Sequence, residues 1–212
     1  MGVGERDEVI VIGDIHAEYN QYLNLLSRYP GRSSVQIGDF GIGFRPVPEL
    51  PEGAWFFRGN HDNPELARAH PNYLGDYGVR ELDGVKFFWV SGAWSIDQQF
   101  RTEGVSWWRD EELSYTELEQ AISLYEKERP DLVLTHDGPN VATDFILNRY
   151  SLHKTKPIPT RTGQALDAMW SIHHPKKWIF GHWHVNWKQE IEGTEFRCLG
   201  ELGWCEVNKE KK

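Results

Sequence analysis

Five short segments of the chain contain the side chains that most often bind metals or transfer protons. They are Gly13-Asp14-Ile15-His16, Gly38-Asp39, Gly59-Asn60-His61-Asp62, Thr135-His136-Asp137 and Gly181-His182-Trp183-His184. Five of the nine histidines fall in these segments, which a random scatter would seldom produce. Because imidazoles and carboxylates are common ligands of divalent metals, the segments together indicate a metal centre.

The spacing within two of these segments suits metal binding. Side chains two positions apart point the same way along an extended stretch, so Asp14 and His16 could hold a metal from one side, as could His182 and His184. Mixed imidazole and carboxylate donors favour manganese, iron or zinc over calcium or magnesium. The absence of cysteine from the segments argues against a closed structural zinc site.

Each segment follows a stretch that reads as a β-strand. Short apolar runs predict strands at 8–12, 35–37, 54–57, 132–135 and 177–180, and four of them end at or just before glycine. Glycine allows the backbone to turn sharply off a strand and lets a cation come close. Ligands of open α/β sheets gather where strands end and loops begin, so we expect the five segments to meet there.

The remaining pattern completes an α/β fold. Helices are predicted at 19–28, 114–129 and 164–172, with Ser114 and Glu117 forming a capping box, while 136–163 gives no firm prediction. A hairpin turns at Asp83-Gly84, and a final meander runs through 185–189, 195–199 and 204–207. We expect a four-layer αββα-type sandwich of two mixed β-sheets flanked by helices.

Composition limits the class of protein. With 212 residues, 39% of them hydrophobic and 26% charged, the chain suits a single domain over residues 1–212. It has no apolar run long enough for a membrane span and no basic leader followed by an apolar stretch, so we expect a cytoplasmic protein. The net charge of −9 opposes general nucleic-acid binding. The oligomeric state stays open.

Taken in order, the five segments resemble the signature of the calcineurin-like metallophosphoesterases: GD-x-H, GD, GNH-D/E, an isolated loop histidine and GH-x-H. The resemblance extends from residue 13 to residue 184 and implies a dinuclear metal centre. One metal would be held by Asp14, His16 and His184, the other by Asn60, His136 and His182, with Asp39 bridging the two. Manganese is the expected metal, with iron, zinc, nickel or cobalt as alternatives.

The resemblance also implies a reaction. A metal-bound hydroxide would attack the phosphorus of a phosphate ester in line with the leaving group. His61 would not be a ligand but would face the leaving group as a general acid or phosphate contact. Asp62 would steer the ring of His61.

Departures from the family's branches favour one class of ester. The protein phosphatase and diadenosine tetraphosphatase branches normally carry Gly after the first His and Asp-Arg-Gly in the second segment. Here Ala17 follows His16, and Phe40 follows Asp39. We therefore expect a small bacterial or phage-type phosphodiesterase acting on nucleotides, cyclic ones included. The alternatives are a phosphomonoesterase or phosphoprotein phosphatase, a diadenosine tetraphosphatase-like hydrolase, and a metal-binding scaffold without catalysis.

Substrate contacts are sought mainly in residues 91–113, a stretch rich in Trp, Asp and Arg that could form a cap loop over the metals. Its tryptophans, Trp94, Trp107 and Trp108, either pack or stack on a substrate ring. The candidate phosphate contacts are Arg45, Arg58, Arg101 and Arg109, with a solvated guanidinium as the alternative. Arg58 is included because it should share a strand face with Asn60.

Side chains outside these segments receive structural interpretations. Four histidines match no motif and should be solvated or core residues, although His153 could approach the site: they are His70, His153, His173 and His174. Cys198 and Cys205 are too few for a disulfide framework and should be small buried hydrophobic residues.

Overall fold

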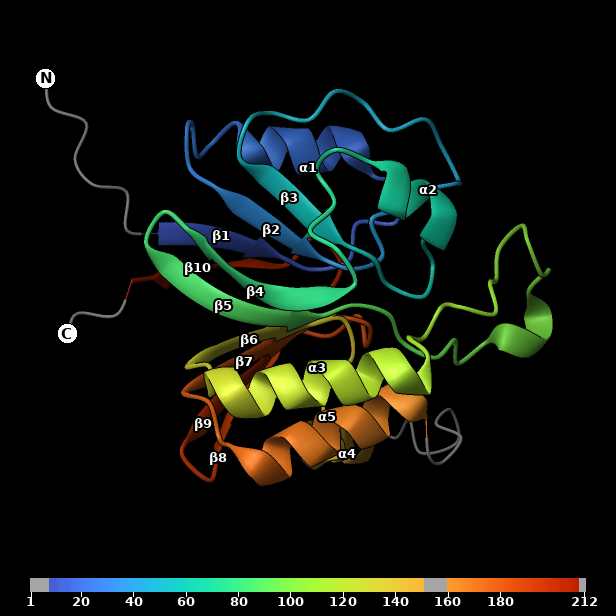
Figure 1. Cartoon of the computed structure of the whole chain (residues 1–212). Coiled ribbons are helices and arrows are strands. Elements are labelled where there is room, and N and C mark those ends of the chain that lie inside the picture. The colour runs from blue at the N-terminus through green and yellow to red at the C-terminus, as the bar shows by residue number, and fades with distance from the viewer. Residues whose placement is uncertain (1–7, 151–159, 210–212) are drawn as a thin grey trace, which may run out of the picture.

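The computed structural model describes residues 8–150 and 160–209 of the chain. Within these residues, two β-sheets lie face to face, and helices cover the outer side of each sheet (Figure 1). This is the predicted four-layer αββα arrangement, and it is confirmed.

The smaller sheet has four strands in the order β10-β1-β2-β3. The strands are β1 (Glu8–Ile12), β2 (Ser34–Ile37), β3 (Ala54–Phe57) and β10 (Trp204–Asn208). β1, β2 and β3 run parallel, whereas β10 pairs antiparallel with β1. Helices α1 (Tyr19–Leu26) and α2 (Pro64–Ala69) lie on the outer side of this sheet (Figure 1).

The larger sheet has six strands in the order β4-β5-β6-β7-β9-β8. They are β4 (Tyr77–Leu82), β5 (Val85–Val90), β6 (Leu132–Thr135), β7 (Lys177–Phe180), β8 (Trp187–Ile191) and β9 (Thr194–Cys198). The four inner strands are parallel, and β4 and β8 close the edges antiparallel. Helices α3 (Tyr115–Glu128), α4 (Asn140–Tyr150) and α5 (Arg161–Ile172) cover the outer face, and a 3-10 turn, η1 (Gln98–Phe100), interrupts the 91–113 loop.

Side chains of the smaller sheet alternate between two hydrophobic cores, one on each face of the sheet. Val9 and Val11 of β1 are buried between the two sheets, whereas Ile10 and Ile12 pack toward α1. Because successive side chains point to opposite faces, a strand buried on both sides reads as an unbroken apolar run, which is how β1 appears in the sequence. The predicted capping box of α3 is also confirmed, since Ser114 and Glu117 exchange hydrogen bonds.

Three elements differ from the predictions. α2 and α4 were not predicted, because α2 has only six residues and α4 has a weakly amphipathic sequence. The final meander is wrong for its last strand, because β10 leaves the hairpin of β8 and β9 and joins β1 in the other sheet. β9 already has β7 and β8 as neighbours, so its two edges are taken before β10 begins.

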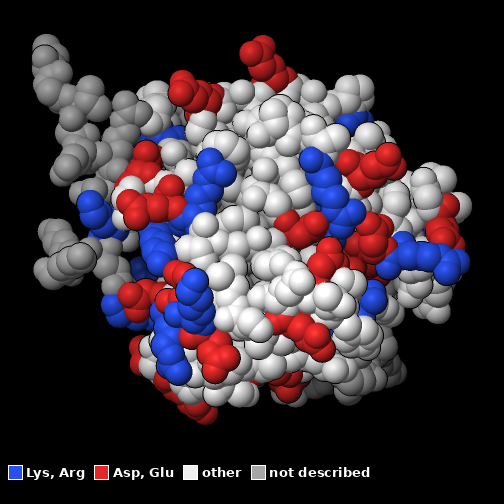
Figure 2. Space-filling view, viewed as in Figure 1, with Lys and Arg blue, Asp and Glu red and all other residues white. Residues whose placement is uncertain are grey.

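The described residues also show whether a helix could span a membrane and how charge is distributed on one face. None of their helices is both long and apolar enough to cross a membrane. On the face shown in Figure 2, Lys and Arg side chains are interspersed with Asp and Glu, so the basic groups of that face do not form a continuous patch.

Leu134 of β6 tests the core between the sheets. It is fully buried there, so Leu134→Ala should lower the free energy of unfolding by about 2–5 kcal/mol through lost apolar burial and a residual cavity. The measurement is urea-induced unfolding followed by circular dichroism. Leu66→Ala removes a half-exposed leucine of α2 and should change stability by much less. Equal losses in the two variants would contradict this location of the core.

Candidate metal centre

The five segments singled out from the sequence meet at one end of the sandwich. Asp14 and His16 follow β1, Asp39 follows β2, and Asn60 follows β3, all from the smaller sheet. His136 follows β6, and His182 and His184 follow β7, from the larger sheet. The His182 amide donates hydrogen bonds to the Asp14 carboxylate at 3.1 Å, so the loops of the two sheets are in direct contact.

One group of side chains gathers around Asp14. The ligand atoms of Asp14, His16, Asp39 and His184 all lie within 4.8 Å of one another, so this group could hold a metal ion. The Nε2 atoms of His16 and His184 are 3.0 Å apart, and His184 Nε2 is 3.2 Å from Asp14 Oδ2. Four donors that face one point in this way suit a single cation.

A second group gathers around Asn60. Its Oδ1 atom lies 3.0 Å from both His136 Nε2 and His182 Nδ1. Asp39 connects the two groups, because its Oδ1 is 3.2 Å from His136 Nε2 while its Oδ2 is 3.9 Å from His16 Nε2. The structure thus brings together all seven residues predicted as ligands and puts Asp39 between the two sets.

The chemistry of Asp39 fits a bound cation. Burial by itself would raise the pKa of Asp39, but the imidazoles of His136 and His61 hold it well below its usual range. Its Oδ2 atom is buried without a hydrogen-bond partner among the described residues. A buried, ionised oxygen without a partner is costly, and imidazole nitrogens converge on the same place. The residues present therefore fit divalent cations.

The backbone conformation of the paired ligands differs from the extended one that was predicted. His16, Asp39, His182 and His184 have positive φ angles, between 45° and 67°. The paired ligands therefore do not lie on an extended stretch, and tight left-handed turns bring them to the same side instead. Such φ values are uncommon for residues other than glycine and cluster at functional sites.

Steric contacts explain two of the glycines. A Cβ atom on Gly59 would overlap Oδ1 of Asp39, and one on Gly181 would overlap Oδ1 of Asp14. We expected glycine here so that a cation could come close. The structure shows that each glycine first makes room for the carboxylate of a ligand from a neighbouring loop.

His61 lies beside the seven residues rather than among them. Its Nε2 atom is 3.9 Å from Asp39 Oδ2 and 3.0 Å from Nη2 of Arg101. Its backbone N–H donates to Asp39 Oδ1 at 2.8 Å. Burial lowers the pKa of His61, an effect that Asp39 opposes and the Arg101 guanidinium reinforces.

Asp62 has a different role from the predicted one. Its two oxygens accept hydrogen bonds from four backbone amides, those of Gly59, Phe40, Gly41 and Ile42. These bonds occupy its acceptor sites, so Asp62 ties the loop after β2 to the loop after β3 and does not steer the ring of His61. The neighbouring segments that carry Asp39 and Asn60 are thereby held in register.

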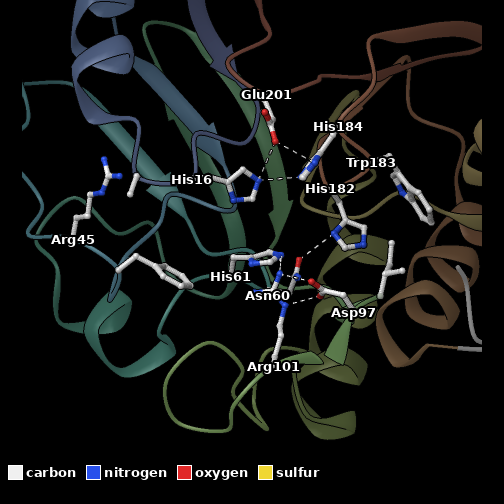
Figure 3. Close-up of a pocket in the computed structure, with 13 residues that line it drawn as sticks. His16, Arg45, Asn60, His61, Asp97, Arg101, His182, Trp183, His184 and Glu201 are labelled. Carbon is white, nitrogen blue, oxygen red and sulfur yellow. Dashed lines mark hydrogen bonds and ion pairs between the residues drawn. The ribbon is translucent and has the colours of Figure 1, made fainter. Parts of the chain in front are cut away.

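A cavity of about 770 Å³ opens beside this centre (Figure 3). It is lined by His16, Ala17, Phe44, Arg45, Asn60, His61, Ile96, Asp97, Arg101, His182, Trp183, His184 and Glu201. Arg45 and Arg101, both predicted substrate contacts, approach it from different sides (Figure 3). Phe44 is 46% exposed and supplies an aromatic ring that sequence reasoning missed.

Other predicted substrate contacts lie elsewhere. Arg58 is fully buried, pairing with Asp76 and donating to the carbonyl of Glu111, because β3 ends at Phe57 and strand alternation no longer places Arg58 beside Asn60. Trp94 is half-buried and is not one of the residues that line the cavity within the described chain. Arg109 is paired with Glu103 at the surface. The prediction is wrong for Arg58, which is fully buried, and substrate contact by Trp94 stays a prediction.

Several residues of the site belong to no sequence motif and were not predicted. Glu201, in the loop between β9 and β10, has Oε1 3.3 Å from Nδ1 of His184 (Figure 3). A carboxylate on the second nitrogen of a ligating histidine fixes its tautomer and orientation. Only the crossing of β10 to the smaller sheet brings this loop to the centre. Trp183, between His182 and His184, is buried and donates to Asp137 at 2.9 Å.

The remaining histidines and the cysteines have structural surroundings. His70 accepts from the Asn72 amide, the carbonyl of His173 accepts from Tyr125, and the His174 ring stacks on Trp170. His153 lies outside the described residues. Cys198 and Cys205 are buried and free, as predicted.

Comparison with known proteins identifies the family. The chain belongs to the calcineurin-like phosphoesterase family, whose sequence profile matches residues 8–186. A lariat debranching enzyme of Entamoeba histolytica is 20% identical over 258 aligned positions, covering 96% of this chain and 71% of the relative. The resemblance inferred from the five segments is confirmed.

A solved structure shares the fold, and a second one aligns with most of the chain. Phosphopantetheinyl hydrolase from Mycobacterium tuberculosis superposes with a TM-score of 0.53 at 10% identity, covering 94% of this chain and 91% of that one. A predicted phosphoesterase from Streptococcus pneumoniae gives a TM-score of 0.47 at 17% identity, with 95% and 83% of the two chains covered.

Gly181 offers a direct test of the crowding around Asp14. Gly181→Ala should displace the Asp14 carboxylate and abolish binding of the cation that it helps to hold, since the new Cβ has no free space. Manganese titration by calorimetry measures the effect. Gly200→Ala is the matched control, because its Cβ would meet its nearest atoms at 3.4 Å. Unchanged affinity in Gly181→Ala would contradict the role given to Asp14.

Proposed function

We propose that this protein is a dinuclear-metal-dependent phosphoesterase that hydrolyses phosphodiesters of nucleotides, cyclic ones included. The observation that carries the proposal is the gathering of six other ligand-type side chains around Asp39. Its two oxygens face two separate groups, each of which has the donors for one cation.

The ligands divide between the two cations by position. Asp14, His16 and His184 would hold one ion, Asn60, His136 and His182 the other, and Asp39 would bridge them. Two bound divalent cations would supply Lewis acidity to the phosphate and lower the pKa of the attacking water. Manganese suits the mixed set of imidazoles, carboxylates and one carboxamide.

His61 and Arg101 supply groups that the ligands do not. Both line the cavity, and they lie within 3.0 Å of each other. His61 would donate a proton to the departing oxygen or contact the phosphate, and Arg101 would neutralise charge on the same side. Asp97 holds the Arg101 guanidinium through two hydrogen bonds of 2.6 Å.

The cavity supports a diester of moderate size. Its volume lies within the range of about 300–1,000 Å³ that small-molecule sites occupy. Phe44, Ile96 and Trp183 give it apolar surface beside the metal centre, which an ester substituent such as a nucleoside could cover. We propose the 91–113 loop, which supplies Ile96, Asp97 and Arg101, as a cap over this substrate.

A comparison of two chromogenic esters tests the proposal. With added manganese, the protein should hydrolyse bis-p-nitrophenyl phosphate faster than p-nitrophenyl phosphate, and a panel of cyclic and linear nucleotide diesters should then identify the substrate class. A preference for the monoester would favour a phosphomonoesterase or phosphoprotein phosphatase. Binding of two manganese ions without hydrolysis of either ester would favour a non-catalytic scaffold.

Substitution of Asp39 and of His61 should separate metal binding from proton transfer. Asp39→Ala should lose both bound metal and activity, because it removes the oxygen atoms that face both groups. His61→Ala should keep about two metals per chain and lower turnover by about 10²- to 10⁴-fold, the usual contribution of a general acid. Metal content by elemental analysis and steady-state rates provide the measurements. Full activity in Asp39→Ala would refute its bridging role.

Arg101 should affect the use of substrate rather than the binding of metal. Arg101→Gln removes a charged hydrogen-bond donor worth about 1.5–3 kcal/mol, so kcat/KM should fall by about 10- to 100-fold with metal content unchanged. Arg109→Gln is the control, since Arg109 belongs to the same loop but pairs with Glu103 at the surface. Equal rates for the wild type and Arg101→Gln would exclude a substrate contact.

A further inference from the structure

Ser95 and Glu111 are two buried polar residues near opposite ends of the 91–113 loop. Neither belongs to the ligand set, and neither lines the cavity within the described chain. Their contacts nevertheless lead directly to a ligand. The Asn60 Nδ2 group donates to Ser95 Oγ at 3.1 Å, and Ser95 Oγ donates to Glu111 Oε2 at 2.5 Å.

The number of protons available decides which group donates and which accepts in each of these hydrogen bonds. The Ser95 hydroxyl accepts from Asn60, so its own proton requires an acceptor, which the Glu111 carboxylate supplies. The other Glu111 oxygen accepts from the Ser95 backbone N–H at 2.9 Å. Burial raises the pKa of Glu111 to about 7, against the opposing effect of these hydrogen bonds, so the carboxylate form prevails above neutral pH.

The direction matters because a carboxamide has two unlike ends. Only the oxygen of Asn60 can bind a cation, since its NH₂ group has no available lone pair. In the structure this oxygen faces His136 Nε2 and His182 Nδ1, each at 3.0 Å, and the NH₂ group faces Ser95. A rotation by 180° about the last bond of Asn60 would turn its NH₂ group toward His136 and His182. It would also turn the oxygen toward Ser95, whose hydroxyl proton is already donated to Glu111.

The hydrogen bonds from Asn60 to Ser95 and from Ser95 to Glu111 form a relay, and Glu111, the acceptor at its end, is itself held in place. The carbonyl of Glu111 accepts from Nη1 of Arg58 at 2.7 Å, and Arg58 Nε donates to Asp76 at 2.7 Å. Gly92 packs so closely on that carbonyl that a Cβ atom would overlap it. Arg58 is fully buried, so this support does not depend on a mobile surface side chain.

We propose that Ser95 and Glu111 are positioning residues that hold the carboxamide oxygen of Asn60 toward the second cation. The inference rests on the proposed dinuclear centre and adds to it a polar relay from the ends of the 91–113 loop. This relay connects the 91–113 loop, which carries the proposed substrate contact Arg101, to the metal ligand Asn60.

Metal titration of two single variants, their double variant and a control variant tests the relay. Ser95→Ala removes its middle member. Glu111→Gln replaces one acceptor oxygen by a donor, which must then face either the Ser95 amide or its hydroxyl proton. Residues that hydrogen-bond to a metal ligand typically contribute about 10- to 100-fold to metal affinity. Ser95→Ala and Glu111→Gln should therefore each bind one of the two manganese ions that much more weakly. Glu112→Gln is the control, because this neighbouring buried carboxylate contacts Thr162 and Arg161 instead.

The titration is made by calorimetry at about pH 8, with the spectrum of manganese as an independent readout. The wild type should show the paramagnetic resonance signal of two coupled manganese ions, and Ser95→Ala and Glu111→Gln at limiting metal should show that of a single ion. The double variant should lose no more affinity than either single one, because both break the same relay. Circular dichroism confirms that each variant is folded.

The outcomes separate this inference from the proposed function. Unchanged manganese affinity in Ser95→Ala, additive losses in the double variant, or an equal loss in Glu112→Gln would each overturn the relay. A wild type that binds fewer than two ions would overturn it as well. A wild type that binds two ions but hydrolyses no phosphate ester would refute the proposed function, while the affinities of the variants would still decide the relay.

Discussion

A buried carboxylate that must stay ionised is the constraint on which this structure depends. Asp39 lies at the end of β2 with one oxygen lacking any partner among the described residues, and imidazoles from both sheets surround it. Removing a charge from water is costly unless opposite charge replaces the lost solvation. The two sheets therefore have to end at the same place, since neither of them alone carries enough donors to compensate Asp39.

Much of the surrounding polar structure fixes the loops that carry the donors. Asp62 binds four amides of the loops after β2 and β3, Glu201 reaches His184, and Ser95 with Glu111 reaches Asn60. Together these groups act on the loops after β2, β3 and β7. Positive φ angles at four of the ligands have a conformational cost, and such a cost is tolerated only where neighbouring contacts over-determine the backbone.

The sequence predicted the sheets and the ligands because both rest on local signals. Apolar runs ending at glycine mark strands such as β1, and the order of the five segments is specific to one family. Glu201 could not be found in the same way, since its place beside His184 depends on which sheet β10 joins. Arg58 was misplaced because strand alternation was applied one residue past the end of β3. The short helix α2 and the weakly amphipathic α4 lack the periodicity on which a helix prediction depends.

The antiparallel pairing of β10 with β1 has a practical consequence. Glu8 and Asn208 are opposite each other in this pairing, at the end of the strands remote from the loop that carries Asp14. An affinity tag or surface tether attached next to either residue starts from the side away from the cavity.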